Sequence, residues 1–400
     1  MGKYFKSTDI LLPDSVDMEK WAVIACDQFT SDKEYWKRVH QNADGAPSTL
    51  HMILPEAELA TSTDETIAEI NACMDRYLSD GVFQEYQNAF VYIERTLVNG
   101  TIRQGVIGAV DLEHYHYEPA RHPMICATEM TVLERIPPRV AVRKDAKLEF
   151  SHVLLLCEDP QFLLIEVLAK KKDQMKKLYD FDLMENGGHI AAWLVQGEDA
   201  NVFSDALEQY EQTNTYLVGD GNHSLVTAKT IYDQLKQELP EEEYSVHPAR
   251  YAMVELENVH SSAMEFEPIH RVMTKTDVQK LLKDLESICD PDGVCVKWFA
   301  GEKQGELKIR TPKGELTVGV LQDFLDAWMQ DNTAEIDYIH GDDAVRQLGM
   351  QENAIGFLLP TMDKSELFPF VQNGRTLPRK TFSMGHGCEK RYYLEGRKIR

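Results

Sequence analysis

The chain is 400 residues long, with 43% hydrophobic and 27% charged side chains, a composition that allows a large core without disulfide or metal cross-links. Its 66 acidic and 42 basic residues give a net charge of −24, which repels nucleic-acid backbones and anionic lipid and excludes a general role on either. No apolar run is long enough to cross a bilayer and the seven cysteines include no Cys-x-x-Cys pair, so we expect a cytoplasmic protein with reduced thiols.

The first part of the chain predicts alternating strands and helices. A helix is expected from about Thr63, where apolar side chains recur on one face until Asp80-Gly81 ends it. Asn99-Gly100 is typical of a type I′ turn and predicts a hairpin between Arg95–Val98 and Thr101–Val110. Further strands are predicted at Ala22–Cys26, Phe90–Glu94, Val153–Cys157, Phe162–Leu168 and Thr215–Val218.

An acidic Pro-Glu-Glu-Glu stretch follows Leu239 and is the best linker candidate, which predicts two α+β regions at residues 1–240 and 246–400. Near the end of the chain, Asp363 and Glu366 form a capping-box-like helix start, and Gly374 a stop. Other elements of this part are predicted as helices at Asp277–Ile288 and Leu321–Met329 and as strands at Tyr251–Leu256, Glu306–Ile309 and Glu315–Val320. Strands and helices mix without strict βαβ order, so the predicted fold class is α+β, with a mixed, largely antiparallel sheet and packed helices.

The strongest chemical signal is the strand, turn and helix over Thr215–Lys229. Two glycines around Asp220 allow a sharp turn and leave no side chain to block a ligand. Asn222 is a good N-cap type, and the backbone N–H groups of the helical turn that follows lie at the positive end of the helix dipole, where phosphate binds readily. The alternative is an ordinary capped helix in which Asp220 satisfies backbone amides.

Several side chains of this turn are predicted to face the same ligand. Thr227 lies one helical turn after His223, so both face the same side. Asp220 is placed to hold a metal-bound phosphate or to accept a proton from a hydroxyl nucleophile. The predicted phosphate-binding residues of the turn are Gly219, Gly221, Asn222, His223, Ser224 and Thr227.

The stretch Val218–Lys229 resembles the Asp-Gly-His-His-Arg-type signature of a bacterial family known as domain of unknown function 1015, which is often encoded beside serine-biosynthesis genes. Four further segments resemble motifs of that family in the same order along the chain, namely Glu94–Asp111, Ile125–Arg135, Pro268–Arg271 and Leu377–Ser383. The chain is identified as a member of this family by these likenesses, although Ala127-Thr128 replaces the family's Pro-His before Glu129.

The same signature is similar to that of the superfamily of partition protein B, sulfiredoxin and free serine kinases, in which a glycine turn at a helix start holds nucleotide phosphates. This resemblance implies a core of that kind around residues 215–235, with His223 in the phosphate-contacting position and Asp220 in the acidic position. Ser224 stands where arginine is usual, so a bidentate phosphate contact is lost. Either a remote cation replaces this contact, with Arg135, Arg139, Arg143 and Lys380 as the candidates, or phosphate binding is weakened or lost.

The resemblance implies a nucleotide-dependent phosphotransferase that acts on a small hydroxylated metabolite such as serine, with ATP, ADP or another nucleotide and Mg²⁺ as cofactors. Phosphoryl transfer depends mainly on positioning and charge neutralisation. Asp220 or Glu129 would therefore orient the acceptor hydroxyl or bind Mg²⁺. The alternative, which Ser224 favours, is a non-catalytic protein that a nucleotide or metabolite gates; a DNA clamp of the partition type lacks the basic element it needs.

Other groups of polar residues have ordinary explanations. His114 and His116 share a face of a predicted strand and, with His122 and Cys126, form the alternative metal site, but no fourth ligand follows from the spacing, so no metal is predicted. Lys380 is equally explained as a solvated lysine. His386 and Cys388 are explained as loop residues, and His270 with Arg271 as an ion-pairing end of a strand.

Overall fold

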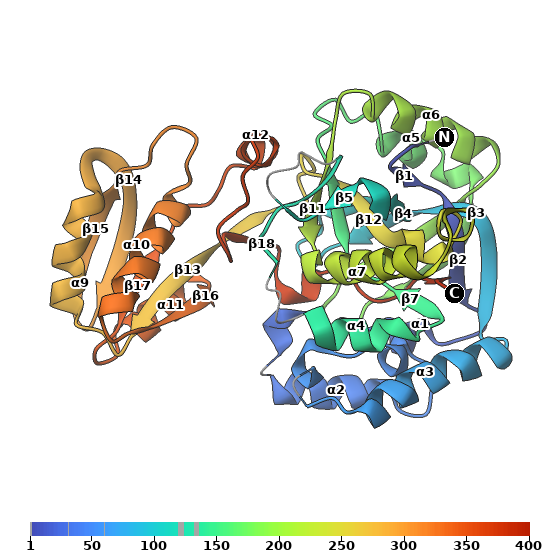
Figure 1. Cartoon of the computed structure of the whole chain (residues 1–400), viewed down its shortest axis with the longest axis horizontal. Coiled ribbons are helices and arrows are strands. Elements are labelled where there is room, and N and C mark those ends of the chain that lie inside the picture. The colour runs from blue at the N-terminus through green and yellow to red at the C-terminus, as the bar shows by residue number, and fades with distance from the viewer. Residues whose placement is uncertain (1, 31, 60, 119–123, 132–135) are drawn as a thin grey trace. The chain divides into compact units, whose positions relative to one another are not determined.

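The computed structural model describes residues 2–30, 32–59, 61–118, 124–131 and 136–400. The chain divides into two compact units, one of Met1–Met264 with His386–Arg400 and one of Glu265–Gly385 (Figure 1). The boundary expected at residues 240–246 instead falls inside the first unit, because the strand that follows it, Tyr251–Asn258, pairs in that unit's sheet. None of the helices in the described segments has both the length and the apolar character needed to cross a membrane.

Within the described residues, the first unit is built on a 13-stranded mixed sheet. Its strands are β1 (Phe5–Lys6), β2 (Thr8–Pro13), β3 (Phe83–Thr96), β4 (Ile102–Asp111), β5 (Tyr115–His116), β6 (Ile125–Ala127), β7 (Leu148–Phe150), β8 (Leu154–Cys157), β9 (Lys176–Asp182), β10 (His189–Val195), β11 (Tyr216–Asp220), β12 (Tyr251–Asn258) and β19 (Gly396–Lys398). The main order is β5-β6-β11-β8-β12-β4-β3-β2-β19-β7. Most neighbours are antiparallel, and β6 runs parallel to β5 and β11.

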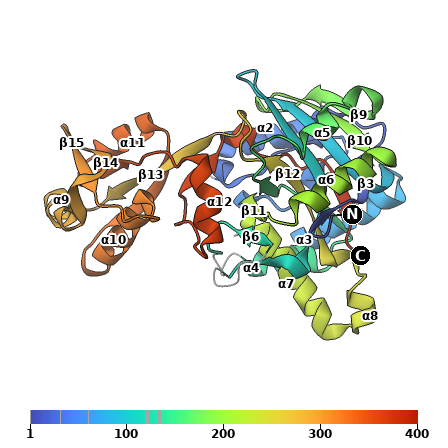
Figure 2. The ribbon, with the colours of Figure 1, turned by 90° about the horizontal axis from the view of Figure 1, so that it is seen from above.

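The helices of the first unit pack on this sheet and form two hydrophobic cores. They are α1 (Met18–Trp21), α2 (Lys33–Ala43), α3 (Asp64–Ser79), α4 (Ile136–Lys144), α5 (Glu166–Ala169), α6 (Glu198–Tyr210), α7 (Asn222–Glu238) and α8 (Glu241–Tyr244). Apolar side chains of α2 and α3 pack with β2 and β3, while those of α6 and α7 pack with β8, β11 and β12. Helix α4 lies alongside α7 in both views (Figures 1 and 2).

The second unit has its own sheet, in the order β15-β14-β17-β13-β16, with β18 paired to β13. Its elements are β13 (Phe266–Thr274), α9 (Val278–Leu285), β14 (Cys289–Ala300), β15 (Lys303–Ile309), α10 (Thr317–Asp331), β16 (Glu335–His340), α11 (Asp342–Gly349), β17 (Ile355–Leu358), α12 (Lys364–Gln372) and β18 (Phe382–Met384). Adjacent side chains of a strand face opposite sides. Met273 accordingly packs in the core with α9 and α10, and Val272 in the core with α11.

The α+β fold class with a mixed, largely antiparallel sheet is confirmed, and so are many local predictions. Strands β3 and β4 pair around Asn99-Gly100, and Thr63 caps α3 through its side chain. Asp363 caps α12 in a capping box with Glu366. Strong local signals of turns and caps therefore located these elements correctly.

Three predicted strands are wrong. Ala22–Cys26 is a buried segment with a single β-bridge, between Val23 and Tyr393. Phe162–Leu168 is a loop followed by α5, because Asp159 accepts the N–H groups at its start. Glu315–Val320 contains the start of α10, whose Val318 and Leu321 pack into the core at helical spacing.

Candidate functional site

Helix α7 begins directly after strand β11 through one left-handed residue. Gly221 has φ +84° and ψ 24° and takes the N-cap position that the sequence assigned to Asn222. A Cβ at Gly221 would lie 2.9 Å from Val153 Cγ2 and 3.0 Å from Val153 Cα. Both the backbone conformation and this close approach therefore require glycine at position 221.

Asn222 is the first helical residue, and its side chain turns inward rather than capping the helix. Only 8% of Asn222 is exposed, and its Nδ2 lies 3.4 Å from Thr128 Oγ1. The Thr128 hydroxyl in turn donates to the Val218 carbonyl at 2.6 Å. Asn222 thus ties the start of α7 to the end of β6, which is a positioning role rather than the predicted ligand contact.

The first turn of α7 remains partly open to solvent. His223 and Ser224 are half-buried, and the first helical hydrogen bond runs from the Leu225 N–H to the Gly221 carbonyl. The helix itself offers no acceptor to the N–H groups before Leu225, which lie at the positive end of its dipole. Thr227 differs from the prediction, because it is buried and its hydroxyl donates to the His223 carbonyl at 2.8 Å.

Asp220 and Glu129 lie at the ends of neighbouring parallel strands. Val218 of β11 is in register with Ala127 of β6, so the residues that follow leave the sheet at the same edge. Asp220 Oδ1 accepts the Gly221 N–H at 2.8 Å, and its side chain is 33% exposed. Glu129 is half-buried. The structure thus brings the two predicted acidic residues to one edge of the sheet.

Lys390, which the sequence did not predict as a site residue, forms an ion pair with Asp220 in the β11–α7 turn. Lys390 Nζ lies 3.2 Å from Asp220 Oδ2, and the Lys390 side chain is 10% exposed. The segment His386–Arg391 that carries it follows the second unit in the chain and returns to the first unit. No spacing or local pattern links residues 220 and 390, so only the tertiary structure could reveal the pair.

Close to the turn, His152 and Tyr393 form a half-buried pair that the sequence did not indicate. The Tyr393 hydroxyl and His152 Nδ1 share a hydrogen bond of 2.5 Å. Burial lowers the pKa of His152, while the charge of Asp220 acts in the opposite direction. Burial also raises the pKa of Tyr393, so the pair is neutral at pH 7. It is therefore a neutral hydrogen-bonded pair close to Asp220.

The predicted cations have other partners or lie elsewhere. Arg143 is paired with Glu149, whose other oxygen accepts the Met253 N–H at 2.5 Å. Arg139 is paired with Glu56. Arg135 lies outside the described residues. Arg139 and Arg143 therefore neutralise carboxylates of the first unit.

Lys380 belongs to the second unit, where two of the motifs noted in the sequence meet. It has φ +57°, and its carbonyl accepts a hydrogen bond of 2.9 Å from Arg271. Arg271 also donates to the Arg379 carbonyl at 3.0 Å, and β18 pairs with β13 next to these residues. The Pro268–Arg271 strand thus fixes the loop that contains Lys380.

Of the four residues considered together for a metal, His114, His116 and Cys126 lie in the described segments. Among the described residues, no cluster of three or more His, Cys, Asp or Glu side chains is arranged to hold a metal ion. His114 packs edge-on against Tyr4, and burial raises the pKa of Cys126 to about 12. His122 lies outside the described residues.

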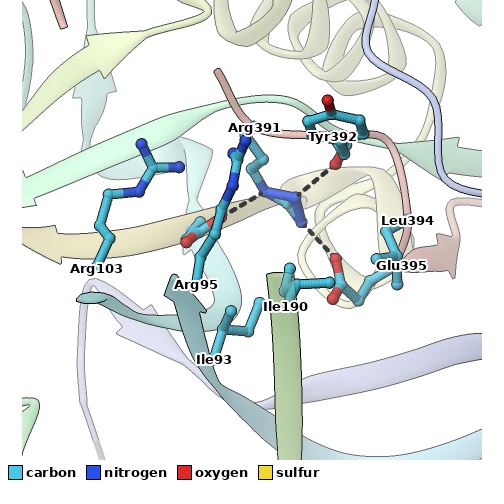
Figure 3. A pocket seen from close by; sticks show the side chains of 9 residues that line it. Ile93, Arg95, Arg103, Ile190, Arg391, Tyr392, Leu394 and Glu395 are labelled. Atoms are coloured by element: carbon cyan, nitrogen blue, oxygen red, sulfur yellow. Dashed lines mark hydrogen bonds and ion pairs between the residues drawn. The ribbon is translucent and has the colours of Figure 1, made fainter. Parts of the chain in front are cut away.

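A buried cluster of charged side chains anchors the segment that carries Lys390 (Figure 3). Arg95, Arg103 and Arg391 line it with Glu255 and Glu395, around a cavity of about 10 Å³. Such a volume has room for about one water molecule, so this cavity does not accommodate a metabolite. Its arginines instead serve the backbone, since Arg95 donates to the carbonyls of residues 187, 388, 389 and 390.

Comparisons with known proteins give one strong match. The family model described as "Protein of unknown function (DUF1015)" matches residues 11–370. No curated protein matches the chain. Structures that resemble it include a free serine kinase in complex with AMP, 13% identical over 72% of this chain and 90% of that chain, with a TM-score of 0.39.

Two further structures are similar at the same level. A C-terminally truncated SbnI from Staphylococcus aureus is 9% identical over 70% of this chain and 82% of its own, with a TM-score of 0.37. A conserved hypothetical protein from Pyrococcus furiosus is 13% identical over 73% and 94%, with a TM-score of 0.34. At these scores the function must be argued from the geometry of the chain itself.

Proposed function

We propose that this chain, which belongs to the DUF1015 family, binds the phosphate group of a nucleotide or another small phosphorylated ligand at the β11–α7 turn. The observation that carries the proposal is the half-buried first turn of α7, which follows a left-handed glycine and whose first N–H groups have no acceptor within the helix. Helix-terminal N–H groups donate hydrogen bonds to a phosphate, and the helix dipole favours its negative charge. The resemblance of Val218–Lys229 to phosphate-binding signatures supports the same assignment.

The proposed ligand contacts are the backbone N–H groups at the start of α7 and the His223 side chain. Gly219 is part of β11, Gly221 allows the turn by packing its backbone against Val153, and Ser224 offers one hydroxyl donor. Asn222 and Thr227 support the turn from inside, through their bonds to Thr128 and to the His223 carbonyl. We expect ADP, ATP or a related nucleotide to bind, because each presents the phosphate oxygens that these donors match.

Within this proposal, catalysis would be phosphoryl transfer to a small hydroxylated metabolite. Glu129 is placed at the same sheet edge as Asp220 and would orient the acceptor hydroxyl or hold Mg²⁺. Asp220 fits Mg²⁺ poorly, because one of its oxygens accepts the Gly221 N–H and the other faces the Lys390 ammonium. When bound, Mg²⁺ would neutralise phosphate charge, and no step of the proposal depends on it.

A second function, ligand binding without turnover, is favoured by the same ion pair. Both oxygens of the Asp220 carboxylate are already engaged, one by the Gly221 N–H and the other by the Lys390 ammonium, which leaves little capacity to orient an acceptor hydroxyl. In that case the bound nucleotide would act as a regulatory signal. The two functions differ in whether a phosphorylated product forms.

Binding and turnover can be measured on the same protein. Isothermal titration calorimetry with ADP, ATP and CTP tests binding, and mass spectrometry after incubation with ATP, Mg²⁺ and a panel of amino acids and sugars tests turnover. We expect H223A to weaken nucleotide binding by about 1.5–3 kcal/mol if the contact is charge-assisted. Q234A, at an exposed position of the same helix, is the control and should bind like the wild type.

The outcomes separate the alternatives. A phosphorylated product that wild type forms and E129Q does not form, while E129Q still binds nucleotide, supports the phosphotransferase. Nucleotide binding without product supports the regulatory protein. A wild-type protein that binds no nucleotide, or an H223A variant of unchanged affinity, contradicts the proposed site.

A further inference from the structure

Lys390 is a nearly buried lysine whose positive charge is only partly neutralised by the groups around it. Its ammonium has three N–H donors. Its ion-pair partner among the described residues is Asp220, at 3.2 Å. Asp220 also accepts the Gly221 N–H, so its negative charge is shared between the two donors. An ammonium in this position retains donors for an additional anionic oxygen.

The backbone that carries Lys390 is held on both sides. Arg95 donates to the Lys390 carbonyl at 2.8 Å and to the Glu389 carbonyl at 3.0 Å, and Arg103 donates to the latter at 2.8 Å. On the other side, Arg391 pairs with Glu395 at 2.9 Å (Figure 3). Three buried arginines therefore fix the position of one lysine, which is the support that a preorganised binding residue needs.

A purely structural ion pair explains this arrangement less well. Burying an ammonium carries a desolvation penalty, and the attraction to one carboxylate offsets it only with good geometry and further hydrogen bonds. Position 224 of the neighbouring turn holds serine, so the first turn of α7 contributes no cationic side chain of its own besides His223. Lys390 therefore brings a positive charge to the same turn in which Ser224 replaces the usual arginine.

Resting on the proposed function, we infer that Lys390 is the phosphate-binding cation of this site and takes the role that arginine has at the position of Ser224 in related signatures. The ammonium would bind a phosphate oxygen on the side away from Asp220, while the N–H groups of α7 bind other oxygens of the same group. The ligand class is a phosphate monoester or anhydride, such as a nucleoside diphosphate.

Calorimetric titration of ADP and of inorganic pyrophosphate into variants of the full chain tests the inference. We expect K390M to raise both dissociation constants at least about tenfold, and K390R to restore them to within about threefold of wild type, since arginine keeps the charge. The matched control is K398M in the same C-terminal segment, where Lys398 makes an exposed ion pair with Glu85. Its dissociation constants should equal those of the wild type.

The results distinguish this inference from the proposed function. Unchanged affinity in K390M, with weakened affinity in H223A, overturns the role of Lys390 and leaves the proposed site intact. A wild-type protein that binds neither ADP nor pyrophosphate overturns both.

A measurement on the wild type avoids dependence on the folding of K390M. We expect ADP to slow the acetylation of Lys390 by an N-hydroxysuccinimide ester, followed by peptide mass spectrometry, and to leave Lys398 unaffected. Equal acetylation rates of Lys390 with and without ADP, at an ADP concentration that calorimetry shows to be saturating, overturn the inference.

Discussion

Each unit of the molecule contains a buried arginine that holds a lysine-bearing segment by its backbone. In the first unit Arg95, 3% exposed, donates to the carbonyl of Lys390; in the second unit Arg271, fully buried, donates to the carbonyl of Lys380. The difference lies in the lysines themselves. Lys390 pairs with Asp220 at the start of a helix, whereas Lys380 stands in a left-handed loop conformation.

This comparison shows that two buried arginines which hold similar segments can serve different purposes, the proposed ligand binding in one unit and local structure in the other. The Arg95 anchor joins segments far apart in the chain and completes the candidate site, while the Arg271 anchor joins the strand and loop of a single small unit. Variants made in matched pairs, one in each unit, can therefore separate stability from ligand binding.

The largest effect is expected from R95M and R271M. Each leaves several buried carbonyl groups without a donor, and we expect each to lower the free energy of unfolding by about 3–5 kcal/mol. Urea unfolding measures this loss. Of the two, R95M alone should also weaken ADP binding, since only Arg95 positions Lys390; equal ADP affinities in both variants would contradict the comparison.

Two helix-start glycines give the next largest effect. Gly221 before α7 and Gly341 before α11 have nearly the same φ, +84° and +83°, but only Gly221 has atoms within 4 Å of an added Cβ. Their ψ angles differ, however, since Gly221 has the αL value of 24° and Gly341 has 135°. G341A should cost about 1–3 kcal/mol for this strained backbone alone. G221A should cost about 1–2 kcal/mol for its αL backbone and about 1–3 kcal/mol more because its methyl group meets Val153. A total loss in G221A below about 2 kcal/mol, measured by thermal or urea unfolding, would contradict the contribution of Val153.

The pH dependence of stability can be compared at two histidines, the half-buried His152 in the first unit and the buried His270 in the second. Burial lowers the pKa of each, opposed by Asp220 and Asp342 respectively. Because the unfolded chain then binds the proton more tightly, stability is fully present above the unfolded pKa of about 6.5 and is lost as pH falls through the lower folded pKa.

H152Q and H270Q should each reduce this loss of stability between about pH 7.5 and pH 5, the interval that contains the unfolded pKa. The measurement is the midpoint of thermal unfolding as a function of pH. H40Q, which changes an exposed ring, is the control. A pH profile in H152Q parallel to that of the wild type would show that His152 does not titrate on unfolding.

The smallest effect is expected at exposed ion pairs. Lys398 with Glu85 in the first unit and Lys275 with Glu335 in the second are solvent-exposed pairs at 2.7 Å and 2.6 Å. K398M and K275M should each change the free energy of unfolding by about 0–1 kcal/mol, because water and salt screen both charges. A loss as large as that of R95M would mean that charge alone, rather than burial, sets the scale.

Much of the local structure could be predicted because turn and cap residues act on their neighbours. Asn99-Gly100 located the hairpin, Thr63 the start of α3, and the glycines around Asp220 the change from β11 to α7. The failures came where a short apolar run fits both a strand and a helix. The run at Glu315–Val320 contains the start of α10, because its apolar residues pack into a core together with residues of strands that are distant in the sequence.

The candidate site divides in the same way. The residues of the β11–α7 turn are contiguous, so their placement follows from the sequence, and Glu129 joins them through the register of β6 with β11. Lys390, His152 and Tyr393 could not be found by spacing, since they come from other segments of the chain. The roles expected for Arg139 and Arg143 changed because Glu56 and Glu149 lie beside them in the folded chain.

The sequence by itself determined the family, the α+β class, the acidic charge and the glycine turn that starts α7. Only the tertiary structure decided which cation pairs with Asp220 and where the two units divide. It also decided that the Thr227 hydroxyl bonds to the His223 carbonyl within the helix. The physical reason is the distance along the chain over which each kind of interaction acts. Backbone sterics and caps act over a few residues, whereas ion pairs and burial depend on segments that folding brings together.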